Sequence, residues 1–430
     1  MHDESLTFEQ CVRHAAISDI GMRRQNNQDS MNTVVAPERS YWEQRGHLYL
    51  VADGMGAHAA GELASKLAAD GLPHIYAKHT DLEPALALRQ AILEANNKIY
   101  EKGHANAEFQ GMGTTCSALV LLPVGAIVGH VGDSRVYRLR DGKLEQLTFD
   151  HSLVWEMRAA GQIPANAENI HVPKNIITRS LGPNPVVKID LEGPFPMAVG
   201  DRFLLCSDGL TGPVTDPELG AILASMSPDE AVQMLVDLAN LRGGPDNITV
   251  IVVEVVGLPA EAVVDEPEDE KRSTKLLIVL ALIGLVAMTN ASFWFLPLKL
   301  AAFLSSAAVL AAVIVAVLRY LDSDTGPDIP IMPSKLGAGP YVSIDAGPSD
   351  LEVDALKKVA EELKQVATAS EKQVDWVTFD DKTAAAEAAT SRQDYMAAVQ
   401  DYGRAISFAV AQVKKQSDER LASDSHVDLI

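Results

Sequence analysis

The sequence predicts an α+β fold for residues 1–257, in which antiparallel sheets carry helices on their outer faces. Short runs rich in Val, Leu, Ile and Tyr, bounded by Gly, Pro or Asp, predict strands at 47–52, 114–122, 125–131, 136–140, 202–206 and 247–256. Several of these runs are neighbours along the chain, and long helices interrupt them rarely. This order favours antiparallel sheets over a doubly wound parallel sheet.

Helical stretches are expected at 61–77, 83–102, 152–160, 216–226 and 228–241. The last of these begins in SPDEAVQML, where Ser227 suits the N-cap, proline takes the first helical position and acidic residues follow in the first turn. RDGK at 140–143 predicts a tight hairpin turn, because an Asp-Gly pair tolerates positive φ.

Composition limits the class of protein. A length of 430 residues suggests two or more domains, and a net charge of −22 argues against a nucleic-acid partner, since polyanions would be repelled. Cys11, Cys116 and Cys206 are scattered in apolar surroundings without a CxxC pair, which predicts three buried, reduced thiols. The polar start MHDESLTFEQ lacks the features of a signal peptide, so we expect the first region to be cytoplasmic.

Residues 258–275 are charged and predict a linker, and the region 276–318 that follows is apolar. Runs 276–296 and 300–318 contain no charged residue, and each approaches the ~20 residues that a bilayer crossing needs. We therefore predict a two-helix transmembrane hairpin that turns at FLPLK. This hairpin predicts a multi-pass membrane protein. Its N- and C-terminal regions are expected on the cytoplasmic side, because cations flank the two runs: Lys271, Arg272, Lys275 and Arg319.

The last third of the chain is predicted to be helical. Residues 319–348 are rich in Gly and Pro and predict a linker, whereas DALKKVAEELKQVA within 349–430 has the apolar spacing of a helix. AAAEAATSRQDYMAAVQDYGRAISFAVAQVKK resembles one helix pair of tetratricopeptide type, followed by a polar tail. Two readings stay open for this region: a bundle that binds a protein partner, or a solvated helical hairpin without one.

Five turns in the first 257 residues each carry an aspartate: Asp29, Asp53, Asp133, Asp208 and Asp246. Three of these residues follow an apolar, strand-like run, and Asp246 precedes one. Carboxylates that converge at strand ends repel one another unless cations neutralise them. Oxygen ligands without a Cys/His cluster suit Mg²⁺ or Mn²⁺ rather than zinc. Any single turn of this kind is ordinary turn chemistry, but the ordered set predicts a shared metal site.

Residues 14–257 resemble the metal-dependent protein phosphatases of the PP2C (PPM) family, in the bacterial form that opposes Ser/Thr kinases. The matching stretches are GMRRQNNQD (21–29), VADGMGAHAAGELAS (51–65), GMGTTCSALV (111–120), GHVGDSRVYRLRDG (129–142), DHSLV (150–154), RSLG (179–182), LLCSDGL (204–210) and GGPDNITVIVVEV (243–255). Their order and spacing match as well. The resemblance implies a sandwich of two antiparallel sheets with helices on both outer faces.

The resemblance also implies a ligand set. Asp53 matches the residue that bridges two metal ions, and Gly54 matches a residue whose carbonyl oxygen binds metal. Asp208 and Asp246 match the carboxylates that complete the first metal's shell. Asp29 matches an acidic residue that binds metal through water.

Asp133 matches the residue that, with Asp208, holds a third and weaker metal ion in bacterial members. Arg24 matches the arginine that grips the substrate phosphate, and residues 150–178 match a mobile flap beside the site. His58 is a candidate general acid by position, and a loop histidine that touches solvent is the competing reading. Gln28 replaces a common Glu and Ala57 a common Gly, and we expect activity to survive both departures.

The implied reaction is hydrolysis of phosphoserine and phosphothreonine on proteins by a water that two Mn²⁺ or Mg²⁺ ions activate, with a third ion in some members. The implied partners are phosphorylated targets of Ser/Thr kinases. Two competing hypotheses remain open at this point: a membrane scaffold that kept the fold but recruits partners, and a phosphatase dedicated to one regulatory partner.

Overall fold

The computed structural model describes residues 9–57, 59–163, 173, 176–257 and 336–427. These residues belong to one compact unit, which is formed by 1–259 together with 333–430. The second unit, residues 260–332, lies outside the described residues.

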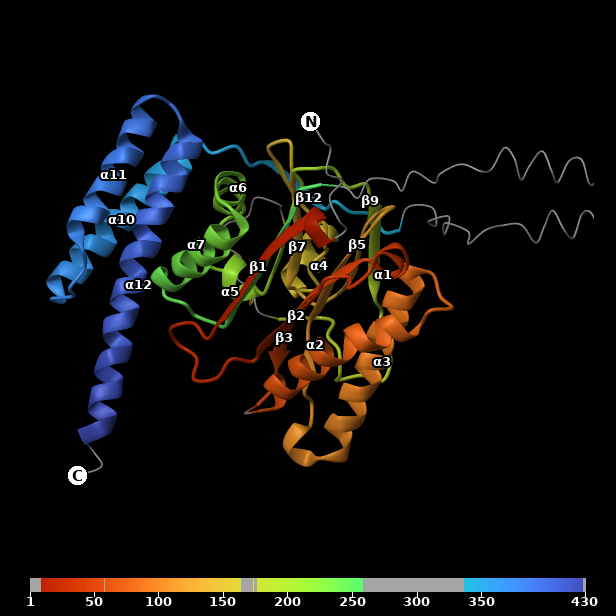
Figure 1. Ribbon diagram of the computed structural model, residues 1–430. Coiled ribbons are helices and arrows are strands. Elements are labelled where there is room, and N and C mark those ends of the chain that lie inside the picture. The colour runs from red at the N-terminus through yellow and green to blue at the C-terminus, as the bar shows by residue number, and fades with distance from the viewer. Residues whose placement is uncertain (1–8, 58, 164–172, 174–175, 258–335, 428–430) are drawn as a thin grey trace, which may run out of the picture. The chain divides into compact units, whose positions relative to one another are not determined.

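Two antiparallel sheets form the centre of the described unit (Figure 1). The first sheet has the order β1 (Val12–Asp19), β11 (Ile248–Val255), β10 (Arg202–Cys206), β7 (Arg135–Arg140), β8 (Lys143–Gln146) and β12 (Val342–Asp345). The second has the order β2 (Asp29–Val34), β3 (His47–Met55), β5 (Cys116–Leu122), β6 (Gly125–Val131) and β9 (Asp190–Phe195), with β4 (Gly113–Thr114) paired to β3. The predicted α+β class and the two antiparallel sheets are confirmed.

Strand β10 shows why these runs are apolar on every residue rather than on alternate ones. Phe203 and Leu205 belong to the core between the sheets, whereas Leu204 and Cys206 belong to the core beneath the covering helices. Successive side chains of a strand point to opposite faces, so a strand that is buried on both faces needs apolar residues throughout. The three cysteines are free and buried, as predicted.

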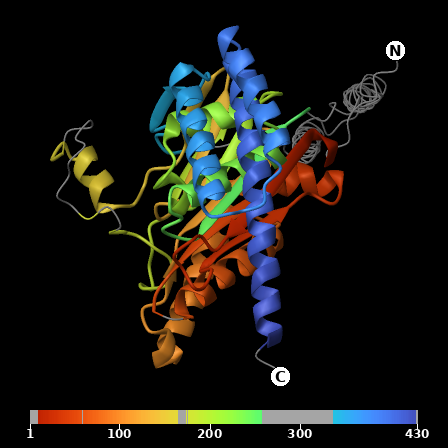
Figure 2. The ribbon, with the colours of Figure 1, turned by 90° about the vertical axis from the view of Figure 1, so that its left-hand side faces the viewer.

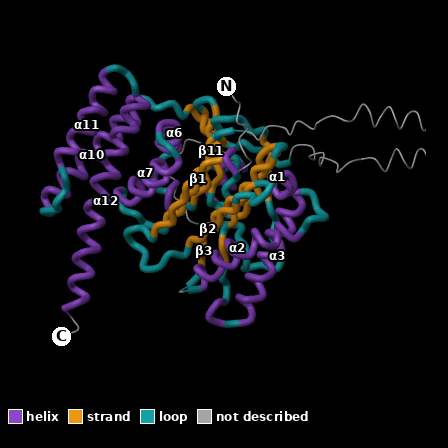
Figure 3. Tube along the Cα trace, viewed as in Figure 1, coloured by secondary structure: helices purple, strands orange, loops and turns teal. Residues whose placement is uncertain are grey.

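Helices cover the outer face of each sheet (Figure 3). α2 (Ala60–Lys78) and α3 (Pro84–Ala105) pack on the second sheet, and α6 (Asp216–Ser225) and α7 (Pro228–Leu241) lie on the side of the first. Ser227 caps α7 through a capping box with Glu230, as its sequence predicts. The remaining short helices are α1 (Arg39–Arg45), α4 (Leu153–Ala159) and α5 (Asp208–Thr211).

The predicted elements appear close to their expected positions, with identifiable differences. The hairpin turn has positive φ at Asp141 and Gly142, as the Asp-Gly pair predicts. The predicted strand 114–122 breaks at Thr115, whose side chain turns to the neighbouring strand β3. Sequence analysis missed β1, β2, β8 and β9, because these strands carry charged or half-exposed residues and β9 contains a Gly-Pro pair.

Part of the range predicted as a linker, 319–348, is a strand. β12 pairs with β8 of the first sheet, and Leu336 bridges Gly193 of β9 in the second, so residues 336–345 join the two sheets. We call these residues the strap. Its anchor is the buried carboxylate of Glu192, which accepts hydrogen bonds from the Tyr341 hydroxyl at 2.6 Å and the Gly339 amide at 2.9 Å.

The C-terminal helices are α10 (Asp350–Ala369), α11 (Trp376–Ser391) and α12 (Tyr395–Val427). α12 packs onto α6 and α7 and α10 onto α6, while α11 packs onto α10 and α12 (Figure 1 and Figure 2). Leu356 and Tyr402 share one apolar core with Leu235, and Arg404 Nε lies 2.7 Å from Glu230 Oε1. The region is therefore not a free, solvated hairpin, because its apolar face is buried against the chain's own helices.

The predicted multi-pass membrane localisation is corrected. Among the residues that the structure describes, no helix has both the length and the apolar character that a bilayer crossing requires. The long helices α10 and α12 carry charged side chains along their length and bury one face only. The predicted hairpin at 276–318 and the linker at 258–275 lie outside the described residues.

Candidate metal and phosphate site

The five predicted aspartates lie at ends of central strands. Asp29 opens β2 and is the register partner of Asp53 on β3. The other three stand beside the ends of further strands: Asp133 between β6 and β7, Asp208 at the start of α5 after β10, and Asp246 before β11. The four other carboxylates all raise the pKa of Asp53, so the structure brings the whole set within electrostatic range.

The negative charges of this cluster are not balanced. Burial, and then the charge of the neighbouring aspartates, holds the pKa of Asp53 well above its usual range. The same two causes raise the pKa of Asp29 to about 6 and that of Asp133 to about 7. The pKa of Asp208 is also raised by burial, with Asp246 as the next cause. The arrangement therefore favours protons or cations at these carboxylates.

Three hydroxyl groups that sequence analysis missed fix the two central aspartates. The Thr115 hydroxyl accepts a hydrogen bond from the Asp53 amide at 2.8 Å, and the Thr114 hydroxyl donates to the Asp53 carbonyl at 2.9 Å. The Ser207 hydroxyl donates to Asp29 Oδ2 at 2.7 Å and so links the two sheets. The signal was their position beside strand ends, inside the stretches GMGTTCSALV and LLCSDGL.

Gly54 follows Asp53 at a point where the backbone leaves no room for a side chain. A Cβ added at Gly54 would lie 2.1 Å from the Gly61 carbonyl oxygen and 2.5 Å from that of Gln28. Its own amide donates to the Gln28 carbonyl at 3.1 Å. The glycine is therefore needed to bring the end of β3 and the start of α2 together.

The donor set fits a hard divalent cation. Asp133 Oδ1 and Asp208 Oδ1 are buried and have no hydrogen-bond partner among the described residues. Such oxygens are costly unless a donor or cation meets them. Within the described ranges, no three His, Cys, Asp or Glu side chains form a ready-made group of metal ligands. The carboxylate oxygens of Asp133 and Asp208 are ligands of the kind that Mg²⁺ and Mn²⁺ take.

Arg24 supplies the cationic group next to the carboxylates. Its Nη2 lies 2.6 Å from Asp246 Oδ2, and about half of the side chain is exposed. One edge of the guanidinium is held by the carboxylate, which leaves other N–H groups free to approach an anion from solvent. The predicted phosphate-binding arginine thus lies beside the predicted metal ligands.

Two predicted features fall wholly or partly outside the described residues. His58, the candidate general acid, lies outside them. Of the predicted flap at 150–178, the structure describes 150–163, 173 and 176–178, which include α4. Ser152 N-caps this helix through the Trp155 amide.

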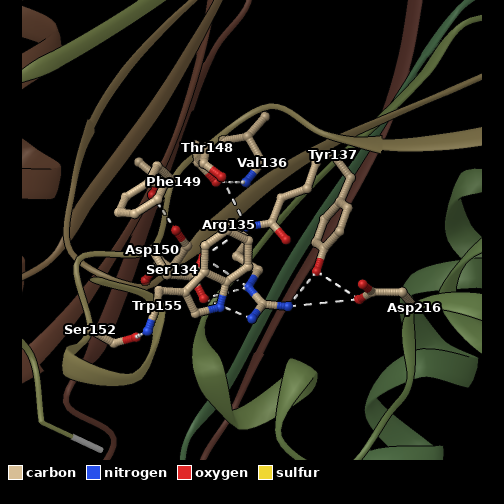
Figure 4. A network of polar contacts seen from close by, with 12 residues as sticks. Ser134, Arg135, Val136, Tyr137, Thr148, Phe149, Asp150, Ser152, Trp155 and Asp216 are labelled. Carbon is tan, nitrogen blue, oxygen red and sulfur yellow. Dashed lines mark hydrogen bonds and ion pairs between the residues drawn. The ribbon is translucent and has the colours of Figure 1, made fainter. Parts of the chain in front are cut away.

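A second group of buried charges lies beside Asp133 and was not predicted. Figure 4 shows Arg135 between the carboxylate of Asp150 and the hydroxyl of Tyr137. Arg135 Nε and Nη2 donate to Asp150 Oδ2 at 2.9 and 2.7 Å, and its guanidinium lies over the Trp155 ring. Tyr137 in turn donates to Asp216, the first residue of α6, at 2.9 Å. This network ties the turn that carries Asp133 to the base of the flap.

Comparison with known proteins places the chain in a family. The family model described as protein phosphatase 2C matches residues 22–240. A protein phosphatase 2C-type protein of Streptococcus pyogenes is 41% identical over 242 residues, which are 55% of this chain and 94% of that protein. The serine/threonine protein phosphatase PstP of Mycobacterium tuberculosis is 37% identical over 57% of this chain and 45% of its own.

Among solved structures, the serine/threonine phosphatase of S. agalactiae is 38% identical, with a TM-score of 0.51, over 57% of this chain and 99% of that one. The predicted enzyme class and the predicted Mn²⁺ or Mg²⁺ cofactor agree with these relatives and are confirmed at the level of the family. The chain belongs to the protein phosphatase 2C family.

Proposed function

We propose that the chain hydrolyses phosphoserine and phosphothreonine esters on proteins, with Mn²⁺ or Mg²⁺ as its cofactor. The observation that carries this proposal is the crowding of five carboxylates at strand ends beside the exposed Arg24. Two of the carboxylates have a buried oxygen without a hydrogen-bond partner in the part of the chain that the structure describes. The substrates are the phosphorylated targets of Ser/Thr kinases. The activity of the relatives by name, serine/threonine protein phosphatase, supports the same substrate class.

The carboxylates have distinct roles in this proposal. Asp53 would hold two metal ions, the Gly54 carbonyl would also bind metal, and Asp208 and Asp246 would complete the shell of the first ion. Asp29 acts through water, and Asp133 together with Asp208 serves a third, weaker ion. When bound, the ions lower the pKa of water and so supply the nucleophile that a phosphate ester requires at neutral pH.

Arg24 orients the substrate. Its guanidinium matches the geometry of a phosphate, and the ion pair with Asp246 sets the direction from which it approaches. Arg24 therefore neutralises phosphate charge at the solvent-exposed side of the site, next to Asp246. This arrangement stabilises the extra negative charge that develops on phosphate oxygens during hydrolysis.

The thiols of the chain do not suit the competing covalent route. Burial raises the pKa of the Cys116 thiol to about 12 and raises that of Cys206 as well. A thiol becomes a good nucleophile only as its thiolate, and burial in apolar surroundings suppresses that form. Direct attack by water is the route that these residues favour.

Hydrolysis of a phosphothreonine peptide with and without metal tests this proposal. Wild-type protein should lose activity in EDTA and regain it with Mn²⁺. Asp53→Asn should lower kcat/KM about a thousandfold, because a ligand shared by both ions loses its charge. Asp70→Asn makes the same chemical change on the exposed side of α2 and should leave activity unchanged. Full activity in EDTA, or in Asp53→Asn, would overturn the proposal.

The proposal also assigns different roles to the N-terminal and C-terminal regions of the chain. We assign catalysis to residues 1–257 and treat 349–430 as a helical, tetratricopeptide-like addition to that region. The strap and the apolar contacts of α12 support treating the addition as bound to the catalytic region rather than as a free recruiting arm. A scaffold without catalysis is the alternative, and retained cellular function of Asp53→Asn would favour it.

A further inference from the structure

α12 runs from the start of α7 to the base of loop 20–24, the loop that carries Arg24. α12 is anchored near the start of α7 by the Arg404–Glu230 ion pair. Ten residues further along α12, Lys414 Nζ lies 3.3 Å from Oδ2 of Asp19, the last residue of β1. In Figure 1 the red loop that follows β1 runs toward α7 and α12. α12, which lies outside residues 22–240 that the family model matches, therefore contacts the base of loop 20–24.

Asp19 organises the start of that loop. Its Oδ1 accepts hydrogen bonds from the Gly21 amide at 2.9 Å and from the Asn240 side-chain amide at 3.1 Å. Burial alone would raise the pKa of Asp19, but these two donors and the Lys414 charge outweigh it and hold the pKa below its usual range. Lys414 is the cationic member of the three partners.

The loop is in direct backbone contact with the residue that pairs with Arg24. Gly21 has a φ of +78°, and a Cβ added there would lie 2.1 Å from the Asp246 carbonyl oxygen. The Met22 amide donates to the Gly244 carbonyl at 2.9 Å. A displacement of Gly21 would therefore push on the backbone of Asp246. The Asp246 carboxylate is paired with Arg24, with 2.6 Å between Oδ2 and Nη2.

We propose that Lys414 is a positioning residue for substrate binding: through Asp19 it holds loop 20–24 in the arrangement that presents Arg24 to the phosphate. The C-terminal helices thereby tune the affinity of the site for phosphate. This inference rests on the proposed function for the role of Arg24, whereas the contact between α12 and the loop stands on geometry.

The full chain and three variants test the inference. Lys414→Met removes the charge, and Lys414→Arg keeps it. Arg404→Met removes the ion pair with Glu230 that anchors the same helix at α7. Each protein is assayed with Mn²⁺ for kcat and KM on a phosphothreonine peptide and for the Ki of inorganic phosphate. Amide hydrogen exchange at Gly21 and Met22 is measured in parallel, so that the loop is observed without reference to activity.

We expect Lys414→Met to raise KM and the phosphate Ki about two- to fivefold with kcat little changed, the range that a half-exposed ion pair supports. Exchange at Gly21 and Met22 should become faster, Lys414→Arg should behave as wild type, and Arg404→Met should leave KM unchanged. In 1 M NaCl the difference between wild type and Lys414→Met should vanish, because ions then screen the pair.

Equal KM, Ki and exchange in wild type and Lys414→Met would overturn the inference, and so would an equal effect in Arg404→Met, which indicates loss of helix docking in general. Failure of the proposed function has a different signature. A wild-type protein without metal-dependent phosphatase activity would refute that function, while the exchange data would still decide whether Lys414 holds the loop.

Discussion

Two groups of carboxylates lie side by side in this protein and differ in what neutralises their charge. In the first group, the Asp133 and Asp208 Oδ1 atoms have no partner within the described part of the chain. In the second group, which surrounds Arg135, Asp150 is held by the Arg135 guanidinium at 2.7 Å and Asp216 by the Tyr137 hydroxyl at 2.9 Å. The first group needs a cation from outside the chain, whereas the second carries its own.

The difference separates the site from its frame. A charge that is paired within the chain depends on its partner. Removing that partner leaves the charge buried and unpaired, which lowers the stability of the fold. Charges left unpaired by the fold destabilise it until a ligand arrives. Mutations in the two groups should therefore have opposite signatures: loss of activity in the first, and loss of stability in the second.

The largest effect is expected for Asp208→Asn. Removal of this charge should lower kcat/KM by at least a hundredfold, about 3 kcal/mol, because a metal ligand is lost. The metal-free protein should be as stable as wild type or more so, because repulsion with Asp246 is relieved. Peptide hydrolysis with Mn²⁺ and urea unfolding in EDTA measure the two quantities. A large loss of stability without loss of activity would break the comparison.

Arg135→Met should show the reverse signature. It leaves the Asp150 carboxylate buried without its cation and frees the Tyr137 contact, which should cost about 3 kcal/mol of unfolding free energy. Urea unfolding of the metal-free protein gives this value directly. Arg39→Met, which removes an exposed ion pair with Glu43, is the matched control and should change stability by less than about 0.5 kcal/mol. Similar effects of both variants would contradict the account.

The first group also predicts how pH and metal act on stability. The pKa values of Asp29 and Asp133, about 6 and about 7, lie above the ordinary value of 3.8. A raised pKa means that the fold favours the protonated form, so its contribution is present at low pH and is lost as pH rises through 6 and 7. Metal-free protein should therefore lose Tm between pH 5 and pH 8.

Mn²⁺ replaces the missing protons, so the rise in Tm that it causes should be larger at pH 8 than at pH 5. Thermal unfolding with EDTA or Mn²⁺ over this pH range measures both trends. Asp133→Asn should flatten the metal-free trend. A metal-free Tm that increases steadily from pH 5 to pH 8 would count against unbalanced carboxylates in the site.

The smallest effect is expected at the strap. Tyr341→Phe removes the hydrogen bond to Glu192 and leaves one oxygen of a buried carboxylate short of a donor, at a cost of about 1 kcal/mol. Activity with Mn²⁺ should stay at the wild-type level, because the strap pairs with β8 and β9, and none of the five aspartates of the site lies on these strands. Unfolding in urea and peptide hydrolysis check the two statements, and a loss of activity larger than the loss of stability would disprove them.

Much of the fold could be predicted because its elements are encoded locally. Strands such as β10 are apolar on every residue, and Ser227 and the Asp-Gly turn mark their elements within a few positions. Strands β1 and β12 could not be found in this way. Their residues are partly exposed, and pairing across the sheet rather than local preference makes them strands.

The site shows the same division. Five aspartates were predicted from their turns and from resemblance, and the structure brings them together. Ser207 and Thr115 stand beside strand ends, but their partners are distant in sequence: Asp29 lies 178 residues from Ser207, and Asp53 lies 62 residues from Thr115. Their position was a signal, but the contacts themselves could not be predicted from local sequence. Arg135 and Lys414 are also defined by tertiary partners alone. The aspartates that would contact a metal ion could be predicted from the sequence. The residues that hold those aspartates and Arg24 in place could not.

Calorimetric titration of the metal-free full chain with Mn²⁺, in two buffers of different ionisation heat, tests the central claim most directly. The account predicts that wild type binds Mn²⁺ with release of protons near pH 7, because cations displace protons from carboxylates of raised pKa. Asp53→Asn should bind much more weakly, and Asp70→Asn should match wild type. Absent binding in wild type, or equal binding in Asp53→Asn, would contradict the claim that these five carboxylates form the metal site.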